Sequence, residues 1–386
     1  MPSLGSEVAL SDYAVELRRI ENDLAELEKI AFAEPVKSED AGRYVYRLYA
    51  RSSLNGNLKE LRRVEESIDR AIACVGPVED LCLLKANLDF KLHRLAETKR
   101  DLALAPALAG RRQGHVILAD IAFQEGRYSE ARAALETLAE EDPAWDVLAR
   151  IAHIEGKMGD AEKADQLYLQ AEDEITAKEM RSFAWVELQR GLLDLSRGRV
   201  DDALAHYEMA DRAYSGYWLT AEHIGDALGS AAHYERVLRE VDKPEVAQKL
   251  GGLSHDGRAE ELFAHALSGY LESAERGEVH FYHHLTEYFA DVRHDGGQAV
   301  KWARKDIALR DNFNTQTALA WALHCAGRSA VGVRYIERAL ASGVKDAGIF
   351  SKAALIFEGA GEPGKAHEWE HRATSLNPLR VYSHVH

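Results

Sequence analysis

The chain has 386 residues, 46% of them hydrophobic, which is enough apolar material for one long repeat array or for two or three ordinary domains. Its 48 basic and 64 acidic residues give a formal net charge of −16, which disfavours nucleic acid and anionic membranes as partners and favours basic proteins. No apolar run approaches the ~20 residues of a membrane span and no secretory signal is visible, so we expect an acidic cytoplasmic protein without membrane insertion.

Residues 1–78 are predicted to be helical. Leu17, Ile20, Leu24 and Leu27 recur at intervals of three or four residues, which is the period of one helical face. Only 8 prolines occur in the chain and alternating strand-like runs are missing, so the whole protein is expected to be all-α. Because residues 1–78 match the later repeat poorly, we interpret them as an N-terminal helical cap or a small bundle.

The clearest repeat unit runs from Gly114 to Pro143. Its first helix carries small residues such as Ala119, a turn follows at Gly126, and a second helix carries Ala131 and ends before the proline. Gly126 can adopt the left-handed conformation that ends a helix, and the two alanines allow antiparallel helices to approach closely. The sequence therefore predicts an antiparallel helix pair.

The same skeleton of small residues around a turn glycine recurs along the chain. The further copies carry Ala152, Gly159, Ala164, Tyr168 and Ala171; Gly191, Gly198, Ala203, Tyr207 and Ala210; Ala320, Gly327, Ile336 and Ala339; and Ala354, Gly361, Ala366, Ala373 and Pro378. This pattern resembles the tetratricopeptide repeat (TPR) family, whose unit is a helix pair of about 34 residues. The resemblance covers about residues 80 to 380, and we assign residues 79–380 to a TPR-like helical repeat array.

The resemblance implies an α-solenoid, a right-handed superhelix in which the first helices line a concave groove that receives an extended peptide or a partner helix. Groove residues face solvent, so their identity reports on function more than the packed alanines do. Alignment of the units predicts the following residues for partner binding: Asp120, Phe123, Gln124, His153, Trp185, His284, Tyr288, Asp291, Asn314, Trp321 and His324.

These groove side chains are carboxylates, amides, aromatic rings and histidines. Some TPR co-chaperones instead clamp an acidic C-terminal carboxylate with lysines, arginines and asparagines. Tryptophan and tyrosine faces attract apolar groups and cations. The predicted partner is therefore another protein or peptide with basic or apolar side chains.

The histidine distribution suggests an alternative function. Of the 17 histidines, 14 lie from His206 onward, and imidazoles three or four residues apart on a helix can chelate zinc, nickel or copper. The candidate ligands are His280, His283, His284 and His294. The alternative is a metal-handling or metal-dependent accessory protein that uses the His-rich C-terminal half.

The stretch from His367 to His371 spells H-E-x-x-H, the zinc-binding pattern of metalloproteases. Its longer version needs a glycine and a histidine at the positions of Thr374 and Asn377, and only 15 residues follow His371 for a distant third ligand. The small residue Ala373 places the motif on a packing helix of the last unit. Since nucleophile elbows and phosphate-binding loops are also missing, we predict neither an enzyme nor a cofactor.

The three cysteines, Cys74, Cys82 and Cys325, include no C-x-x-C pair and are expected to be reduced thiols. Residues 381–386 are expected to form a flexible His-containing tail. The sequence as a whole predicts a non-enzymatic scaffold or adaptor that binds a peptide or partner-protein segment in the concave groove of a superhelix.

Overall fold

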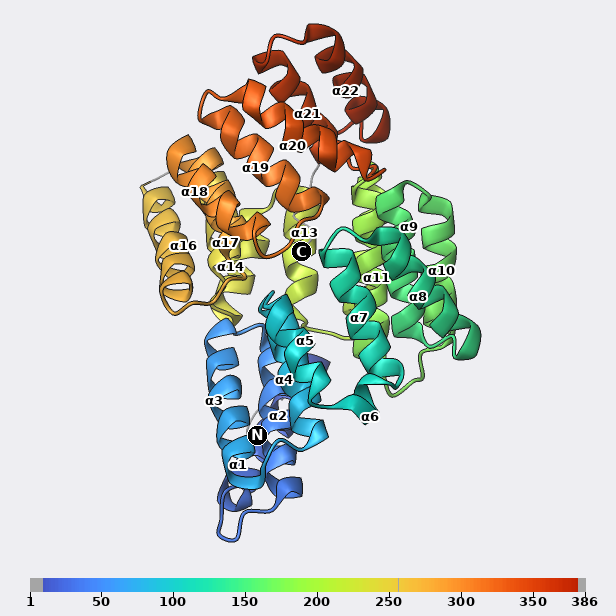
Figure 1. Ribbon diagram of the computed structural model, residues 1–386, viewed down its shortest axis with the longest axis vertical. Helices are drawn as coiled ribbons and strands as arrows, with labels where there is room; N and C mark the ends of the chain where they lie inside the picture. The colour runs from blue at the N-terminus through green and yellow to red at the C-terminus, as the bar shows by residue number, and fades with distance from the viewer. Residues whose placement is uncertain (1–9, 256, 381–386) are drawn as a thin grey trace, which may run out of the picture.

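The computed structural model describes residues 10–255 and 257–380, and every regular element in these two ranges is helical (Figure 1). Consecutive helices pack as antiparallel pairs that stack on their neighbours, so the protein is an all-α solenoid of helical repeats, as predicted. Residues 381–386, for which a flexible tail was predicted, lie outside the described residues. Within the described ranges, no helix combines the length and the apolar character needed to cross a membrane.

The helices of the N-terminal half are α1 (Asp12–Ile30), α2 (Ser38–Asn55), α3 (Leu58–Val75), α4 (Glu79–Lys91), α5 (Leu95–Ala103), α6 (Pro106–Ala109), α7 (Arg112–Gln124), α8 (Tyr128–Glu141), α9 (Trp145–Met158), α10 (Ala161–Asp173), α11 (Met180–Leu195) and α12 (Val200–Ala213). Those of the C-terminal half are α13 (Trp218–Leu228), α14 (Ala231–Glu240), α15 (Pro244–Leu253), α16 (Arg258–Glu275), α17 (Tyr282–Glu287), α18 (Gly296–Ile307), α19 (Phe313–Cys325), α20 (Ser329–Ala341), α21 (Ala347–Gly359) and α22 (Pro363–Leu376). A π-helical turn, η1 (Tyr288–Val292), directly follows α17.

Small residues let the two helices of a pair approach closely. Ala131, Ala164 and Ala203, on the second helices α8, α10 and α12, are completely buried. In the pair α11 and α12, a Cβ atom at position 191 would lie 2.2 Å from Cε1 of the buried Tyr207, so Gly191 leaves the room that this ring needs. The recurrence of small and aromatic residues in the sequence is therefore a packing pattern.

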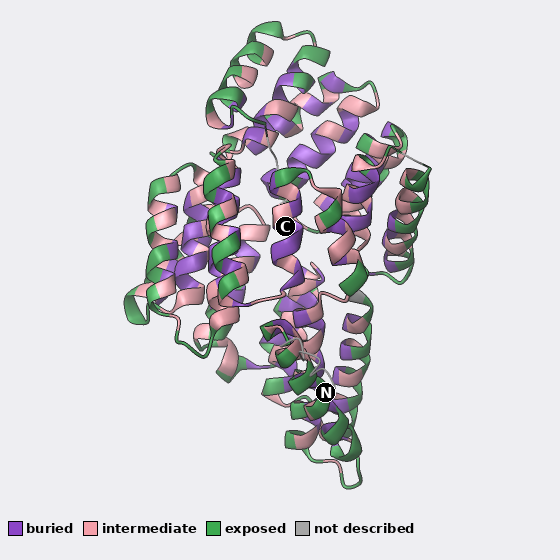
Figure 2. Ribbon diagram, turned by 180° about the vertical axis from the view of Figure 1, so that it is seen from behind, coloured by how far each residue is buried: buried purple, intermediate pink, exposed green. Residues whose placement is uncertain are grey.

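Burial follows the helix faces (Figure 2). Buried residues gather where neighbouring helices meet, and exposed residues occupy the outer faces and the helix ends. The last helix, α22, buries only Ala373. The outer face of α22 is therefore largely exposed, because no further described helix packs on it.

The superhelix contacts itself after one turn. Several hydrogen bonds join residues that are 182 to 189 positions apart in the sequence. With units of about 34 residues, this separation corresponds to roughly 5.5 units per superhelical turn. Figure 1 shows the result, since α19 to α22 at the top of the view meet the ends of α9 and α11.

This contact is made three times, at equivalent places of the repeat. Each time, the end of a first helix meets a loop that lies one superhelical turn later in the chain. The hydrogen bonds run from Asn312 Nδ2 to Gln124 O (2.9 Å), from Lys345 N to Lys157 O (2.8 Å) and from Asn377 Nδ2 to Leu195 O (3.2 Å). Because these three contacts recur with the period of the repeat, they align the helices of one superhelical turn with the loops of the next.

The helices α1 to α3 pack against the middle of the array. Trp218 Nε1, at the start of α13, donates to Leu54 O at 2.9 Å, and Lys59 Nζ donates to Asp242 Oδ2 at 2.7 Å. One hydrophobic cluster contains residues of α1 to α3 together with residues of α11 to α15. The described part of residues 1–78, for which we predicted a cap or small bundle, therefore shares a hydrophobic cluster with the middle of the array.

Candidate functional site

A cavity of about 600 Å³ lies between the first helices of three successive pairs, α7, α9 and α11. It is lined by five of the residues that the repeat pattern predicts for the groove, namely Asp120, Phe123, Gln124, His153 and Trp185. Ser53, Phe90 and Tyr217 add to the wall from the part of the chain that packs against these helices. The structure therefore brings the five predicted positions together around one space, which we call the aromatic cavity.

Aromatic rings form much of its wall. Trp145 and Trp185 pack edge to face with 6.1 Å between ring centroids, and Phe123 and His153 pack in the same way at 5.6 Å. Rings in these positions present large apolar faces, which interact favourably with apolar side chains and also with cations.

The charged groups of this wall have ion-pair partners, within the wall for Asp120 and Arg150 and on α1 for Arg181, whose Nη1 atom lies 3.3 Å from Glu16 Oε1. Arg150 Nε donates to both carboxylate oxygens of Asp120 at 3.0 Å, and Arg150 Nη1 donates to Asp146 O at 2.8 Å. Burial raises the pKa of Asp120, although Arg150 opposes this effect. Burial also lowers the pKa of His153 to about 3, so this ring is neutral at physiological pH. The cavity consequently presents a mainly apolar surface to a ligand.

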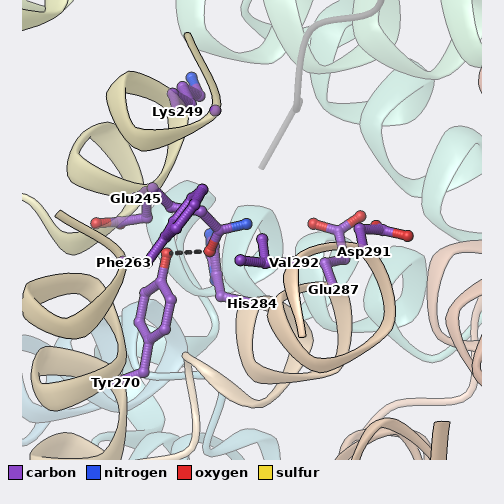
Figure 3. Close-up of a pocket in the computed structure, with 10 residues that line it drawn as sticks. Glu245, Lys249, Phe263, Tyr270, His284, Glu287, Asp291 and Val292 are labelled. Atoms are coloured by element: carbon purple, nitrogen blue, oxygen red, sulfur yellow. Dashed lines mark hydrogen bonds between the residues drawn. The ribbon is translucent and has the colours of Figure 1, made fainter. Parts of the chain in front are cut away.

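A second cavity of about 340 Å³, the acidic cavity, lies between α15, α16, α17 and η1 (Figure 3). Two predicted groove residues, His284 and Asp291, line it together with Glu287 of the same helical segment. Figure 3 shows Glu287 and Asp291 on one side of this space and Glu245 and Lys249 on the other. Carboxylates from α15 and from the segment of α17 and η1 therefore line the cavity.

The floor of the acidic cavity is aromatic. The Tyr270 hydroxyl donates to Gln248 Oε1 at 3.0 Å, which is the dashed line in Figure 3, and the Tyr270 ring lies 5.5 Å from the His284 ring. Burial raises the pKa of Tyr270, so its hydroxyl keeps its proton and acts as a donor. Phe263 contributes a second aromatic ring to the wall.

Two predicted groove residues line neither cavity. Tyr288 is completely buried, where its hydroxyl donates to Phe263 O at 3.1 Å and accepts a hydrogen bond from Arg293 Nε at 2.8 Å. The prediction that Tyr288 faces the groove is therefore wrong, because its ring packs into the core beside Tyr270. Asn314 is exposed in the first turn of α19 and borders neither space.

Trp321 and His324 lie beside the acidic cavity. Trp321 Nε1 donates to Asp291 Oδ1 at 2.7 Å, and the Trp321 and His324 rings stack with 5.1 Å between centroids and 15° between planes. His324 Nδ1 is 3.0 Å from Ser329 Oγ, and burial lowers the pKa of His324. These two predicted residues are thus connected to the cavity through Asp291.

The candidate metal ligands have different surroundings. Burial lowers the pKa of His280 to about 4, whereas His294 is exposed. For His283, burial favours the neutral ring, but the carboxylates of Glu287 and Asp306, at 3.6 and 3.7 Å, raise its pKa to about 9. Within residues 10–255 and 257–380, no three His, Cys, Asp or Glu side chains are grouped so that they could hold one ion. The metal site predicted as an alternative remains a prediction.

The H-E-x-x-H motif lies on α22, the last helix of the array. His367 and His371 are exposed, and the Glu368 carboxylate accepts a hydrogen bond from Arg372 Nη2 at 2.6 Å. The motif therefore lies on the repeat helix where the sequence analysis placed it, and both of its histidines face outward.

The sequence analysis missed the contribution of α15 and α16 to the acidic cavity. These helices provide Glu245, Gln248, Lys249, Phe263 and Tyr270. They form a weak copy of the repeat, so their groove positions could not be aligned. One signal was present, because Pro244 is typical of a helix start and residues four positions apart then share a helical face.

The comparisons with known proteins concern the architecture. Residues 112–217 match the family model of the TT21 fifth ARM repeats domain. A chain in the crystal structure of the APC/C hetero-tetramer Cut9-Hcn1 has a TM-score of 0.44 and 12% identity, with 95% of this chain and 92% of that chain covered. For the structure of Naa15/Naa10 bound to HypK-THB the TM-score is 0.30 and the identity 15%, with 95% of this chain and 64% of that chain covered.

No curated protein matches this sequence. The matched family model describes helical repeats over α7 to α12, the same region that contains the clearest units of the sequence. Together with the antiparallel pairs of the structure, it assigns the chain to the helical repeat proteins in a general sense. The narrower TPR assignment stays a prediction.

Proposed function

We propose that this protein is a non-enzymatic scaffold or adaptor that holds a segment of a partner protein in the groove of its superhelix. The observation that carries the proposal is the aromatic cavity, to which three successive first helices contribute the five residues predicted for the groove. A fold alone does not fix a function, so the proposal rests on the chemistry of this cavity.

The chemistry of the cavity favours an apolar segment. The wall combines aromatic rings, a neutral histidine and charged groups that already have ion-pair partners, so a bound apolar side chain leaves no wall charge unpaired. The three cysteines are free thiols, as expected in a reducing compartment, and the proposal keeps the predicted cytoplasmic location. The overall negative charge favours a basic partner surface around the apolar segment.

The test is capture of a partner from native lysate with matched glutamine variants. Gln189 lines the aromatic cavity on α11, and Gln170 is exposed on α10. We expect Gln189→Glu to reduce recovery of the partner at least about tenfold, because the new carboxylate would be buried beside an apolar ligand. The same change at Gln170 should leave recovery unchanged.

A second variant removes part of the wall. Trp185→Ala deletes one ring of the Trp145 and Trp185 pair and should also reduce recovery of the same partner. Circular dichroism and thermal unfolding show that each variant is folded. Equal recovery of the partner by the wild type, Gln189→Glu and Trp185→Ala would contradict the proposal.

A further inference from the structure

The acidic cavity has more negative than positive groups around it. The carboxylates that line it or contact its lining are Glu222, Asp226, Glu245, Glu287 and Asp291. The cations among them are Lys243, Lys249, Lys352 and the protonated His283. Five carboxylates therefore outnumber four cations in the cavity lining and directly behind it, which leaves the surroundings of the cavity with a negative charge.

The one lysine that lines the cavity is already neutralised. Lys249 Nζ lies 2.9 Å from Glu222 Oε1 and 2.9 Å from Asp226 Oδ1. Both partners are on α13, outside the cavity lining. Because two carboxylates share this one ammonium group, it does not balance the carboxylates that line the cavity.

Glu245 is the carboxylate that can still accept a hydrogen bond from a ligand. It is only 9% exposed, and its Oε1 atom is 4.0 Å from Lys243 Nζ. Its Oε2 atom is buried and accepts no hydrogen bond from any residue that the structure describes. A buried carboxylate oxygen without a donor is unfavourable, so a ligand that brings a cationic donor would be stabilised there.

The rest of the cavity suits the shape of a long cationic side chain. Asp291 is exposed and supplies a carboxylate where the cavity meets solvent. Phe263, Tyr270 and His284 provide ring faces between this position and the buried part. Lysine and arginine pack their methylene groups on apolar surface while the charged group pairs with carboxylates, and ring faces attract cations.

We propose that the acidic cavity binds one cationic side chain, a lysine or an arginine, of the segment that the scaffold holds. The cationic group pairs with Glu245 in the buried part of the cavity, its methylene groups lie on the aromatic floor, and Asp291 attracts the cation where the cavity meets solvent. This inference rests on the proposed function for the identity of the ligand as part of a partner chain. It extends that function by naming a second, charge-selective site.

The test uses four small probes with the full-length protein. N-acetyl-lysine methylamide and the corresponding arginine compound carry the cation, the norleucine compound has a similar length without charge, and the glutamate compound carries the opposite charge. Ligand-detected saturation-transfer NMR measures their binding at low ionic strength. We expect saturable binding of at least one cationic probe, at least tenfold tighter than that of norleucine or glutamate, and weaker binding when salt is raised. Comparison of the lysine and arginine probes shows which of the two cations binds more tightly.

Matched variants identify the site. The double variant Glu245→Gln/Asp291→Asn should weaken cation binding at least tenfold. Both negative charges are lost, whereas the amide side chains keep nearly the size and shape of the carboxylates. The control Glu208→Gln/Asp173→Asn changes two exposed carboxylates on the second helices α12 and α10 and should bind like the wild type.

Three results would overturn the proposal: norleucine binding as tightly as the cations, no saturable binding of either cation, or undiminished binding in the Glu245→Gln/Asp291→Asn variant. The first two comparisons use the wild-type protein and do not depend on folding of a variant. The probes also bind without any partner protein. Failure of partner capture with Gln189→Glu therefore remains distinguishable from failure of cation binding.

Discussion

Turn glycines at the same position of different repeat units have different surroundings. Gly126 and Gly327 both adopt left-handed conformations, with φ of 77° and 70°. A Cβ atom at position 126 would lie 2.6 Å from the carbonyl oxygen of Asp311, which belongs to the next superhelical turn, whereas nothing lies within 4 Å of one at position 327. The repeat pattern explains why both are glycines, and the contact between turns adds a second reason at Gly126.

The pair of glycines provides a matched prediction. Gly327→Ala should cost about 1 to 2 kcal/mol in the free energy of unfolding, which is the strain of a left-handed alanine. Gly126→Ala should cost at least about 1 kcal/mol more, because its methyl group also overlaps a backbone oxygen that cannot move alone. Urea unfolding measures both, and equal costs for the two variants would mean that the contact between turns contributes nothing.

Asp89 and Asp101 form a buried carboxylate pair between α4 and α5. Burial and a hydrogen bond with Asp101 raise the pKa of Asp89 to about 7, although Arg94 opposes this effect. The Oδ2 atoms of both residues are buried without a donor, which a proton shared between the two carboxyl groups would provide.

This pair predicts a pH dependence of stability. The pKa of Asp89 is higher in the folded protein than its ordinary value of about 4, so its contribution to stability falls as the pH rises from about 4 through about 7. Asp89→Asn keeps a neutral donor, so its free energy of unfolding should change less between about pH 5 and about pH 8 than that of the wild type.

Urea unfolding at the two pH values measures this difference. Asp173→Asn, at an exposed position on α10, is the control and should follow the wild type. A slope that is the same in Asp89→Asn and the wild type would show that the pair does not share a proton in this range.

At the scale of elements, ion pairs connect helices that belong to different repeat units. Lys249 on α15 holds Glu222 and Asp226 of α13, and all three side chains are largely buried. Burial opposes ionisation of the Glu222 carboxyl, but the nearby lysines lower its pKa, and the two carboxylates in turn raise the pKa of Lys249. The triad is therefore fully charged at neutral pH.

Removing the lysine should leave two buried carboxylates without a partner. We expect Lys249→Met to lower the free energy of unfolding by about 3 to 5 kcal/mol. Adding Glu222→Gln should recover part of this loss, because one of the unpaired charges is then removed. Lys178→Met, at an exposed position before α11, is the control for loss of a positive charge. Additive costs in the double variant, measured by urea unfolding, would contradict the coupling.

Helices next to clear turn glycines could be placed from the sequence. The predicted unit from Gly114 to Pro143 corresponds to α7 and α8, and the first-helix positions Asp120 and Phe123 line the cavity as aligned. Tyr288 lies in a unit without such a glycine, so its register was not anchored. An error of one position turns a side chain by about 100° around the helix axis, which is enough to move it from the groove to the core.

The π-helical turn η1 had no signal in the sequence. Its hydrogen bond from Arg293 N to Tyr288 O spans five residues, and Arg293 Nε also donates to the buried Tyr288 hydroxyl at 2.8 Å. Turns of this kind are often found at functional sites, and this one carries Asp291 to the acidic cavity. Both the turn and the residues of α15 follow from tertiary packing and not from local pattern.

At the scale of the whole molecule, two sets of long-range contacts join the repeat array. One set connects the N-terminal helices to the middle of the array, and the other connects successive superhelical turns. The helices α1 to α3 share a hydrophobic cluster with α11 to α15, a connection that the prediction of an N-terminal helical cap or small bundle for residues 1–78 did not include. Contacts between residues so far apart cannot be read from a repeat pattern, which is periodic over about 34 residues.

The shared core predicts the outcome of a truncation. Removal of residues 1–78 would expose the aromatic side chains that pack against them, including Tyr217 and Trp218, so the shortened chain should aggregate or lose cooperative unfolding. A truncated protein that is soluble, helical by circular dichroism and as stable as the full chain would support an independent cap instead.

The most direct test of the central proposal asks which surface touches the partner. A photo-crosslinking amino acid replaces Gln189 in the aromatic cavity or, as control, Gln170 on the outer face of α10. After irradiation in native lysate, mass spectrometry identifies crosslinked chains. The proposal predicts that one partner segment is crosslinked from position 189 and not from position 170. Crosslinks from position 170 alone, or none from position 189, would contradict it.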